Sequence, residues 1–398
     1  MAYLWQNPEW PRFSWDYKEL LNSLTELYAN QGILYGQMKT LGFAVQSEST
    51  LNRFTQEIKN SFEIEGVSLN ETSIRSSVAR NLGLENVILA NEGQLDKNRP
   101  HLNYIVEVIT DAVHNCNAPL TEERLFCWHK KLFGNPSGSE SFNGLYAIHV
   151  GQYRTDNEGP MRVISGYGKN ETVHFEAPPA CTLKKQMKAF FDWFNGIDSN
   201  GQKISSVIKS AVAHLYFVEL HPFEDGNGRL ARVIADMALC RGDGNLSRSD
   251  YRTDHLYSMS AQLCKERKKY YEMLHQAEIS GSMDITQWIF WYIGCMNRAV
   301  LSVLAELEES LWRKEFWAKI DSIEINERQR KILKMLLSGF EGKLTSAKYA
   351  KICKCSQDTA GRDIDKLIAS GILIKGQAGG RSTSYELNNN KINCILEK

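Results

Sequence analysis

Apolar residues recur at helical spacing along most of the chain and predict a mainly α fold. The pattern is clear in 17–38, 51–62 and 206–220, and none of these segments contains a proline. Gly66 and Pro222 follow the second and third segments, where they favour a helix end. Residues 206–220 are mostly apolar, so we expect a buried helix that ends directly before His221.

Two short segments, 161–166 and 173–179, indicate β-strands rather than helix. They flank a glycine-rich turn, and prolines beside them stop further strand pairing. We therefore expect a small β-hairpin in an otherwise helical part of the chain. By its pattern alone, an ordinary surface hairpin is the alternative.

The C-terminal region has a different order of elements. Three helices and then a hairpin are predicted at 326–338, 345–352, 356–370, 372–375 and 382–387. This order resembles a winged helix-turn-helix, which we place at 322–398. Between 326 and 388 twelve basic residues stand against six acidic ones, an excess that suits the phosphates of DNA. A protein contact, including a dimer contact, is the alternative.

The overall composition indicates a cytoplasmic protein of two to three domains. The 398 residues carry a net charge of zero, which implies no general attraction to membranes or nucleic acid. We find no signal segment and no uninterrupted apolar run of bilayer length, so we expect no membrane partner. The nine cysteines are scattered and odd in number, which favours reduced thiols.

Residues 1–98 are predicted to form a helical domain. They begin with an aromatic cluster that we expect to seal a small core rather than to bind a partner. The cluster consists of Trp5, Trp10, Phe13 and Trp15.

The segment 221–232, His-Pro-Phe-Glu-Asp-Gly-Asn-Gly-Arg-Leu-Ala-Arg, collects the parts of a nucleotide phosphate site. His221 leaves the buried helix, and an imidazole titrates near neutrality, so it can take a proton from a hydroxyl. Gly226 and Gly228 leave backbone N–H groups uncovered where the next helix begins, and such a helix start binds anions. Phe223 is expected to plug into the core and anchor the loop.

The polar residues of this segment complete the phosphate site. Asn227 offers an amide donor to the same anion, and Arg229 and Arg232 share a helix face from which they can bind two oxyanions. Asp225 suits a site beside phosphates if a hard cation such as Mg²⁺ lies between them. Each residue alone has a structural explanation, but their conjunction within twelve residues predicts phosphoryl or nucleotidyl transfer.

The segment resembles the signature of the Fic family, His-x-Phe-x-Asp/Glu-Gly-Asn-Gly-Arg-x-x-Arg, at every fixed position. The resemblance implies transfer of AMP from ATP to a Ser, Thr or Tyr hydroxyl of a protein, the enzyme itself included, with pyrophosphate leaving. It implies that His221 is the general base and that Asp225 is the Mg²⁺ ligand.

The resemblance also implies the phosphate contacts. Gly226, Asn227 and Gly228 would cradle the α-phosphate of ATP. Arg229 would bind the β-phosphate, and Arg232 would bind the γ-phosphate or an inhibitory carboxylate.

The resemblance extends over 99–313, which we expect to be the Fic catalytic core. The hairpin, from about Arg162 to Pro178, is similar to the family's flap, which clamps a target protein by adding a strand to it. Tyr271 resembles a position near the adenine, although a core aromatic is the alternative. The expected fold is thus mainly α: a Fic-type helical core with a small β-hairpin flap, an N-terminal helical domain and a C-terminal winged helix.

A second family feature lies upstream, at 61–66. Ser61, Glu65 and Gly66 fit the inhibitory pattern Ser/Thr-x-x-x-Glu-Gly/Asn. In Fic proteins of this kind the glutamate pairs with the second arginine of the motif, here Arg232, and takes the place of the γ-phosphate. A solvated glutamate at a helix end is the alternative.

These observations favour an enzyme, a self-inhibited protein adenylyltransferase that uses ATP and Mg²⁺. One alternative is a DNA-binding regulator whose Fic core senses a nucleotide. Another is a Fic enzyme that transfers a different nucleotide or removes AMP, with Glu65 orienting the hydrolytic water. The presence of His221 favours the enzyme, since a sensor needs no base.

Overall fold

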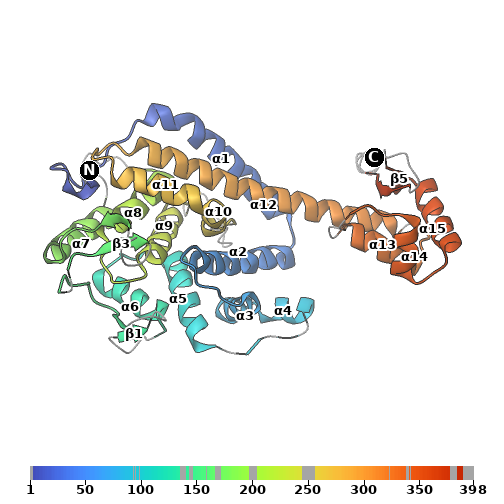
Figure 1. Ribbon diagram of the computed structural model, residues 1–398, viewed down its shortest axis with the longest axis horizontal. Helices are drawn as coiled ribbons and strands as arrows, with labels where there is room; N and C mark the ends of the chain where they lie inside the picture. The colour runs from blue at the N-terminus through green and yellow to red at the C-terminus, as the bar shows by residue number, and fades with distance from the viewer. Residues whose placement is uncertain are drawn as a thin grey trace. The chain divides into compact units, whose positions relative to one another are not determined.

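The computed structural model describes most of the chain and divides it into two compact units. The described residues are 3–92, 94, 96–97, 99–134, 140–142, 147–157, 159–165, 172–196, 204–243, 256–321, 323–337, 340, 342–376 and 383–388. The units are Met1–Val303 and Leu304–Lys398. Within the described part of the chain helices predominate, and the strands form two-stranded antiparallel sheets (Figure 1). The expected mainly α fold is confirmed.

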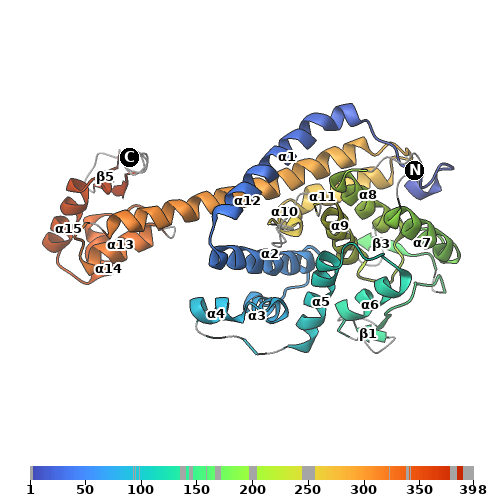
Figure 2. The same ribbon diagram turned by 180° about the vertical axis from the view of Figure 1, so that it is seen from behind.

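The first unit opens with four helices, α1 Tyr17–Thr40, α2 Phe43–Ile64, α3 Glu71–Leu82 and α4 Glu85–Glu92. Asp16 begins α1 by accepting a hydrogen bond from the backbone of Lys18. Figures 1 and 2 show α1 beside the first half of α12 Thr286–Ile320, where Asn30 donates to the Asn297 side chain at 2.8 Å. The helix predicted at 51–62 is the second half of α2, which begins earlier.

Helix α2 is fixed to its neighbours by buried charged groups. Arg53 forms an ion pair with Asp236 at 3.6 Å, and both side chains are almost fully buried. One turn later the Glu57 carboxylate accepts hydrogen bonds from Ser258 Oγ at 2.7 Å and from the Ser260 backbone at 3.1 Å. Buried charges need such partners. These contacts therefore position α2 relative to the helix that carries Asp236 and to the segment that carries Ser258 and Ser260.

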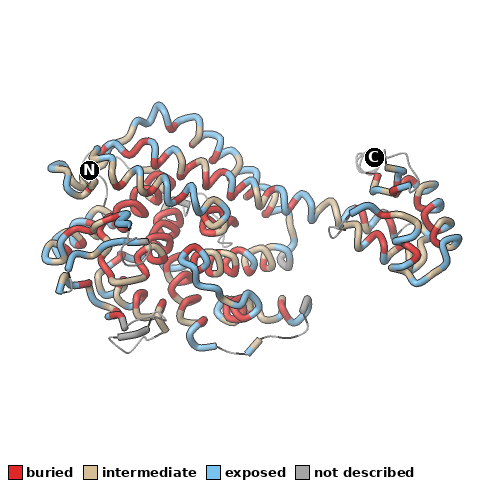
Figure 3. Tube along the Cα trace, viewed as in Figure 1, coloured by how far each residue is buried: buried red, intermediate tan, exposed pale blue. Residues whose placement is uncertain are grey.

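The rest of this unit is built around a central pair of helices, α8 Ser206–Leu220 and α9 Asn227–Asp243. The helices beside this pair are α5 Pro100–His114, α6 Glu122–Leu132, α7 Ala180–Asn195, α10 Met259–Lys265 and α11 Arg267–Glu278. Helix α8 packs along α9, and in Figure 3 this pair lies in the buried centre of the unit. From Val207 to Leu220, α8 is buried at every position except Lys209, which confirms the expected buried helix.

The described residues of the first unit form two hairpins. Strands β3 Arg162–Ser165 and β4 Thr172–Glu176 pair antiparallel, with an irregular register between Val163 and Ile164. This confirms the predicted pair of strands, while Gly166 and the turn lie outside the described residues. The second hairpin, β1 Glu140–Phe142 with β2 Ala147–His149, was not expected from the sequence.

The N-terminal aromatic residues were expected to seal a small core of residues 1–98, and the structure packs three of them against α8 and β4 instead. Trp10 and Phe13 meet the Tyr216 ring of α8 edge to face, at centroid distances of 5.2 and 5.4 Å. Trp5 donates its indole N–H to the carbonyl of Glu176 at the end of β4, at 2.7 Å. The first residues of the chain therefore support the hairpin formed by β3 and β4.

The described part of the second unit contains the second half of α12 and then three helices and a hairpin in the predicted order: α13 Glu327–Leu337, α14 Ser346–Cys353, α15 Gln357–Ala369, β5 Leu373–Lys375 and β6 Tyr385–Leu387. Residues 377–382, including Arg381, lie outside the described part. Leu333, Ile364 and Leu367 are among the residues that close its core. Asp363 of α15 faces this core, where it accepts hydrogen bonds from Arg328 at 2.8 Å and Tyr349 at 3.1 Å.

Helix α12 bears on the expectation of no membrane partner, although polar residues such as Asn297 and Arg298 interrupt its apolar run. Residues Thr286–Ala318 are long and apolar enough to cross a bilayer by length and composition. Core packing accounts for this apolar character, since 56% of the most apolar window is buried within the protein. Trp288, Ile289 and Ile293 are fully buried in this stretch.

Candidate active site

The helix that carries the predicted base ends at the base itself. His221 caps α8 in a left-handed conformation, φ 45° and ψ 56°, which residues other than glycine rarely adopt. Its backbone N–H donates to Phe217 at 3.1 Å, and Pro222 cannot continue the helix. The predicted helix end is confirmed, and the sharp turn leaves the imidazole in the wall of a pocket.

His221 is a neutral imidazole with a defined tautomer. Its Nδ1 lies 3.2 Å from the Val218 carbonyl, which can only accept, so Nδ1 carries the proton and Nε2 the lone pair. Burial, helped by the nearby Arg154 guanidinium, lowers the pKa of His221 to about 4. The ring is therefore uncharged at neutral pH, as a general base must be.

The loop after His221 is anchored by Phe223, as predicted. Phe223 is fully buried and stacks on His129 of α6, with ring centroids 4.0 Å apart. His129 donates from Nε2 to the Asp225 carbonyl and accepts at Nδ1 from the Gly151 backbone, both at 3.0 Å. Burial lowers the pKa of His129 to about 4, in keeping with a neutral ring that donates at one nitrogen and accepts at the other. The sequence contained no signal for this role, because a lone histidine on an amphipathic helix usually packs in a core.

Asn227 holds the glycine turn together. Its side chain accepts from the Phe223 N–H at 3.0 Å and donates to the Phe223 carbonyl at 2.8 Å. The side-chain amide that we expected to meet the anion is thus bound to the loop. Gly226, at φ 83°, makes the turn into α9, whose first backbone N–H groups have no acceptor within the helix. Backbone N–H groups at such a helix start can bind an anion.

Gly228 lies where the start of α9 and the Glu65 side chain of α2 approach each other closely. A side chain at this position would collide with the Glu65 carboxylate, which lies directly against the backbone at the start of α9. The end of α2 and the predicted anion loop therefore share one small space. The sequence places these two segments far apart.

Arg229 is oriented by its neighbours toward Asp225. Its guanidinium is 93% buried and lies over the rings of Phe62 and Phe133, at 5.0 and 4.7 Å. Arg229 Nη2 donates to Asp225 Oδ1 at 3.1 Å, while the Asp225 carboxylate remains a third exposed. Arg229 and Asp225 thus form an ion pair at the start of α9.

Arg232 binds the upstream motif through three hydrogen bonds. Nε donates to Ser61 Oγ at 2.9 Å, and Nη2 donates to the Ser61 carbonyl and to Glu65 Oε1, both at 2.8 Å. Burial alone would lower the pKa of Arg232, but the Glu65 carboxylate raises it above its usual value. Gly66, at φ 79°, ends α2 directly after Glu65, as predicted.

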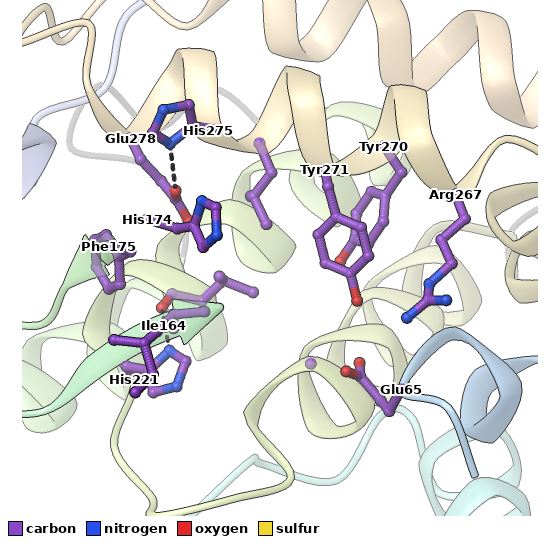
Figure 4. Close-up of a pocket in the computed structure, with 14 residues that line it drawn as sticks. Glu65, Ile164, His174, Phe175, His221, Arg267, Tyr270, Tyr271, His275 and Glu278 are labelled. Atoms are coloured by element: carbon purple, nitrogen blue, oxygen red, sulfur yellow. Dashed lines mark hydrogen bonds and ion pairs between the residues drawn. The ribbon is translucent and has the colours of Figure 1, made fainter. Parts of the chain in front are cut away.

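A pocket of about 460 Å³ opens beside these residues (Figure 4). Glu65 and Gly228 line one end, and Tyr271 lies close by, with Arg267 over its ring at 5.7 Å. Tyr271 is 39% exposed and so faces the pocket rather than the core. The complete lining is Glu65, Val163, Ile164, His174, Phe175, Val218, His221, Gly228, Arg267, Tyr270, Tyr271, Leu274, His275 and Glu278.

The comparison with known families agrees with this geometry. A profile described as the Fic/DOC family matches residues 119–239, which include His221, the anion loop and Arg232. The chain carries a Fic/DOC domain. A second profile, a domain of unknown function called DUF4172, matches residues 3–84, which include the inhibitory pattern.

Several curated proteins are similar to the Fic/DOC domain. "Protein adenylyltransferase Fic" of Nematostella vectensis is 31% identical over 134 residues, covering 33% of this chain and 27% of that protein. "Uridine 5'-monophosphate transferase" of Xanthomonas campestris pv. campestris is 30% identical over 127 residues, covering 31% and 22%. The match spans about a quarter of the length of these relatives. A crystal structure of a Fic family protein from Desulfovibrio desulfuricans G20 aligns with a TM-score of 0.48 at 17% identity, covering 92% of this chain and 96% of that one.

Arg154 is a further residue of the Fic/DOC domain that the sequence did not reveal. Its side chain is almost fully buried, and Nε donates to the His221 carbonyl at 2.7 Å. Nη2 donates to the Pro178 carbonyl at 2.5 Å, just beyond β4. Arg154 therefore ties the backbone of the base to the end of the hairpin, and a lone arginine in a loop gives no sequence signal for such a role.

The hairpin of the Fic/DOC domain contributes to the pocket from the side opposite α11. Ile164 of β3 and Phe175 of β4 line it, as Figure 4 shows. Ile164, Val163 and Val173 are also exposed, at 39% or more of their surface. The hairpin thus lies beside His221 and presents apolar side chains and strand edges.

The metal prediction rests on Asp225. Among the described residues no group of three or more His, Cys, Asp or Glu side chains is arranged to hold a metal ion. Mg²⁺ in nucleotide sites commonly uses one or two carboxylates together with the phosphates of the substrate. A partly exposed carboxylate beside the start of α9 fits that kind of site.

Proposed function

We propose that this protein transfers a nucleoside monophosphate, AMP in the first place, from ATP to a hydroxyl of a protein. The observation that carries the proposal is the neutral His221, whose Nε2 lone pair lies in the same pocket wall as the start of α9. A base beside an anion site is the arrangement that such a transfer needs. Related proteins named protein adenylyltransferase support AMP as the group transferred.

In the proposed reaction the substrate hydroxyl gives its proton to His221 Nε2. The hydroxyl oxygen then forms a bond to the α-phosphorus, while the bond from that phosphorus to the bridging oxygen breaks and pyrophosphate leaves. The first N–H groups of α9 stabilise the charge on the α-phosphate oxygens. Arg229 and Arg232 bind the outer phosphates. Asp225 would hold Mg²⁺, which would neutralise charge on the phosphates.

Self-inhibition is proposed from the pair between Glu65 and Arg232. The Glu65 carboxylate uses the arginine that the γ-phosphate needs, and it lies against Gly228 at the start of α9. A γ-phosphate at the start of α9 would be repelled by the Glu65 carboxylate, and the Arg232 guanidinium would already be engaged by Glu65. ATP can then bind only away from the productive position, and transfer is slow.

The target protein is proposed to bind along the hairpin from about Arg162 to Pro178. A two-stranded sheet has unpaired backbone groups on its outer edges, and an extended segment of a target can add to such an edge. The exposed Val163, Ile164 and Val173 supply apolar contacts there. A hydroxyl on the added segment would then be held near His221.

The C-terminal unit is proposed as an accessory winged helix that binds DNA. Its order of three helices and a hairpin and its excess of basic residues support this role. Asp363, one acidic residue of α15, is turned into the core, whereas Arg362 and Lys366 of the same helix are exposed. A dimer or other protein contact remains the competing proposal. A cytoplasmic location is proposed from composition alone.

Labelled nucleotides test the proposed transfer directly. Full-length protein, its Glu65→Gly variant and its His221→Ala variant are each incubated with α-labelled ATP, GTP or UTP, Mg²⁺ and cell lysate. We expect protein labelling from ATP in the Glu65→Gly variant and almost none without His221. Preferred labelling from UTP would favour the activity named for the Xanthomonas relative. Release of AMP from a labelled protein, without transfer, would reverse the proposed direction.

A further inference from the structure

The end of the pocket far from Glu65 contains an unusual carboxyl group, that of Glu278. Glu278 ends α11 and lines the pocket, yet only 6% of its surface is exposed. Its one described ion-pair contact is with His275 Nδ1, at 3.7 Å, too long for a hydrogen bond. A buried carboxyl without a strong partner is costly, and it is kept where a ligand supplies the missing bonds.

The surroundings of Glu278 disfavour its charged form. Glu219 of α8 is completely buried, and neither of its oxygens has a hydrogen-bond partner among the described residues. Burial and the neighbouring Glu278 raise the pKa of Glu219 well above its usual value. The other titratable groups at this end are His275 of α11 and His174 of β4, whose rings lie 6.5 Å apart. No arginine or lysine lines this end of the pocket in the part of the chain that the structure describes.

The pocket has the layout of a nucleoside site with Glu278 at the base end. Arg267, Tyr271, Leu274 and Glu278 recur every three or four residues, so they line one face of α11. From Tyr271 to Glu278 this face runs about 10 Å along the helix, on the scale of a nucleoside. With the phosphates at the start of α9, the base would reach the part of the pocket that Leu274 and Ile164 help to line. Its edge is then turned to Glu278.

We propose that Glu278 reads the edge of the nucleobase as a neutral carboxylic acid. Its hydroxyl donates to a ring nitrogen of adenine, and its carbonyl oxygen accepts from the adjacent amino group. This inference rests on the proposed function, because it assumes a nucleotide in the pocket. A neutral carboxyl has one donor beside one acceptor, whereas a carboxylate has acceptors alone. Adenine therefore needs the acid form to make both bonds.

The same group makes nucleotide choice depend on pH. Burial raises the pKa of Glu278 to about 8, so the acid form predominates at neutral pH and is lost as the pH rises through that value. The carboxylate can accept from the two adjacent N–H groups of guanine, but it repels a ring nitrogen of adenine. The preference therefore moves from ATP toward GTP as the pH increases.

The test is the ratio of ATP affinity to GTP affinity, measured by calorimetry on full-length Glu65→Gly protein with Mg²⁺. Because both nucleotides carry the same phosphates, the ratio cancels their ionisation. Between about pH 6.5 and about pH 8.5 we expect the ratio to fall at least about tenfold. With Glu278→Gln added, which keeps a donor beside an acceptor at every pH, the ratio should stay constant and favour ATP.

Glu272→Gln is the matched control, since it removes an exposed carboxylate from the same helix. It should leave the pH dependence of the ratio intact. A constant ratio in the Glu65→Gly protein, or the same pH dependence after Glu278→Gln, overturns the role of Glu278. If the expected binding ratios appear but no protein is labelled, the proposed transfer fails and the base-reading role stands.

Discussion

The Glu65 carboxylate at the end of α2 accepts a 2.8 Å hydrogen bond from Arg232 Nη2 on α9. Ser61, one turn earlier on α2, accepts two more from the same guanidinium. Arg232 is 97% buried, so its charge is balanced mainly by a carboxylate that is itself only 31% exposed. An anion that is to bind Arg232 Nη2 must first displace Glu65.

Glu65→Gly should therefore activate the enzyme. Removing the carboxylate leaves Arg232 to the γ-phosphate, and we expect labelling with ATP to rise at least about tenfold, which corresponds to about 1.4 kcal/mol. The measurement is the initial rate of self-labelling or target labelling. Arg232→Ala is the matched variant: it breaks the same pair but also removes the phosphate partner, so it should not activate. Equal activation by both would make the pair a structural salt bridge.

His221→Ala should abolish transfer in the Glu65→Gly background. Loss of a general base costs about a hundredfold to ten-thousandfold in rate, while ATP binding should change little. Because burial lowers the pKa of His221 to about 4, the base stays neutral down to about that pH. Transfer should thus persist from neutral pH to about pH 5 and fall below it as the imidazole is protonated. An unreduced rate in the variant would exclude His221 as the base.

Asp225→Ala should suppress transfer, and chelation of divalent cations should have the same effect. Without the carboxylate the phosphates lose the cation that neutralises charge on the leaving pyrophosphate. ATP binding with and without Mg²⁺, measured by calorimetry, gives an independent readout. Mg²⁺ should strengthen binding to the Glu65→Gly protein and have a much smaller effect once Asp225 is also removed. Full activity in excess chelator would mean that Asp225 holds no Mg²⁺ and only pairs with Arg229.

DNA binding by the C-terminal unit should depend steeply on salt. Each phosphate contact releases counterions, so the affinity of the full-length protein for a DNA duplex should fall as salt increases. Arg362→Ala, on the exposed face of α15, should weaken binding. Lys188→Ala, which removes an exposed charge in the first unit, is the control and should not. A protein that dimerises but does not bind a duplex at low salt would support the protein-contact proposal.

The sequence predicted the helices near the site well because their signals are local. Gly66 and Pro222 stop α2 and α8 whatever surrounds them, since one reverses the chain at a positive φ and the other lacks a backbone donor. The conjunction of His221, Gly226 and Arg232 within twelve residues likewise indicated a phosphate site before any packing was known.

Other parts of the site had no local signal. His129 and Arg154 hold the loop through backbone carbonyls, and a hydrogen bond to a carbonyl requires no particular residue type at the partner position. The expected anion contact of Asn227 stays a prediction, while its hydrogen bonds to the Phe223 backbone, which close the turn, had no local signal. Helix α12 is long and apolar enough for a bilayer, and the sequence alone does not show that more than half of its most apolar window is buried within the protein.

The sequence by itself therefore determined the mainly helical fold, the ends of the helices beside the site and the chemistry of segment 221–232, because these depend on spacing and on intrinsic backbone preferences. The contact between Glu65 and Arg232, 167 positions apart, was expected from the family resemblance and not from any spacing in the sequence, and the tertiary structure brings the two side chains together. The tertiary structure alone decided that Glu278 closes the same pocket. Contacts of that kind are set by how α2, α9 and α11 pack, and packing depends on the whole buried interior rather than on any segment.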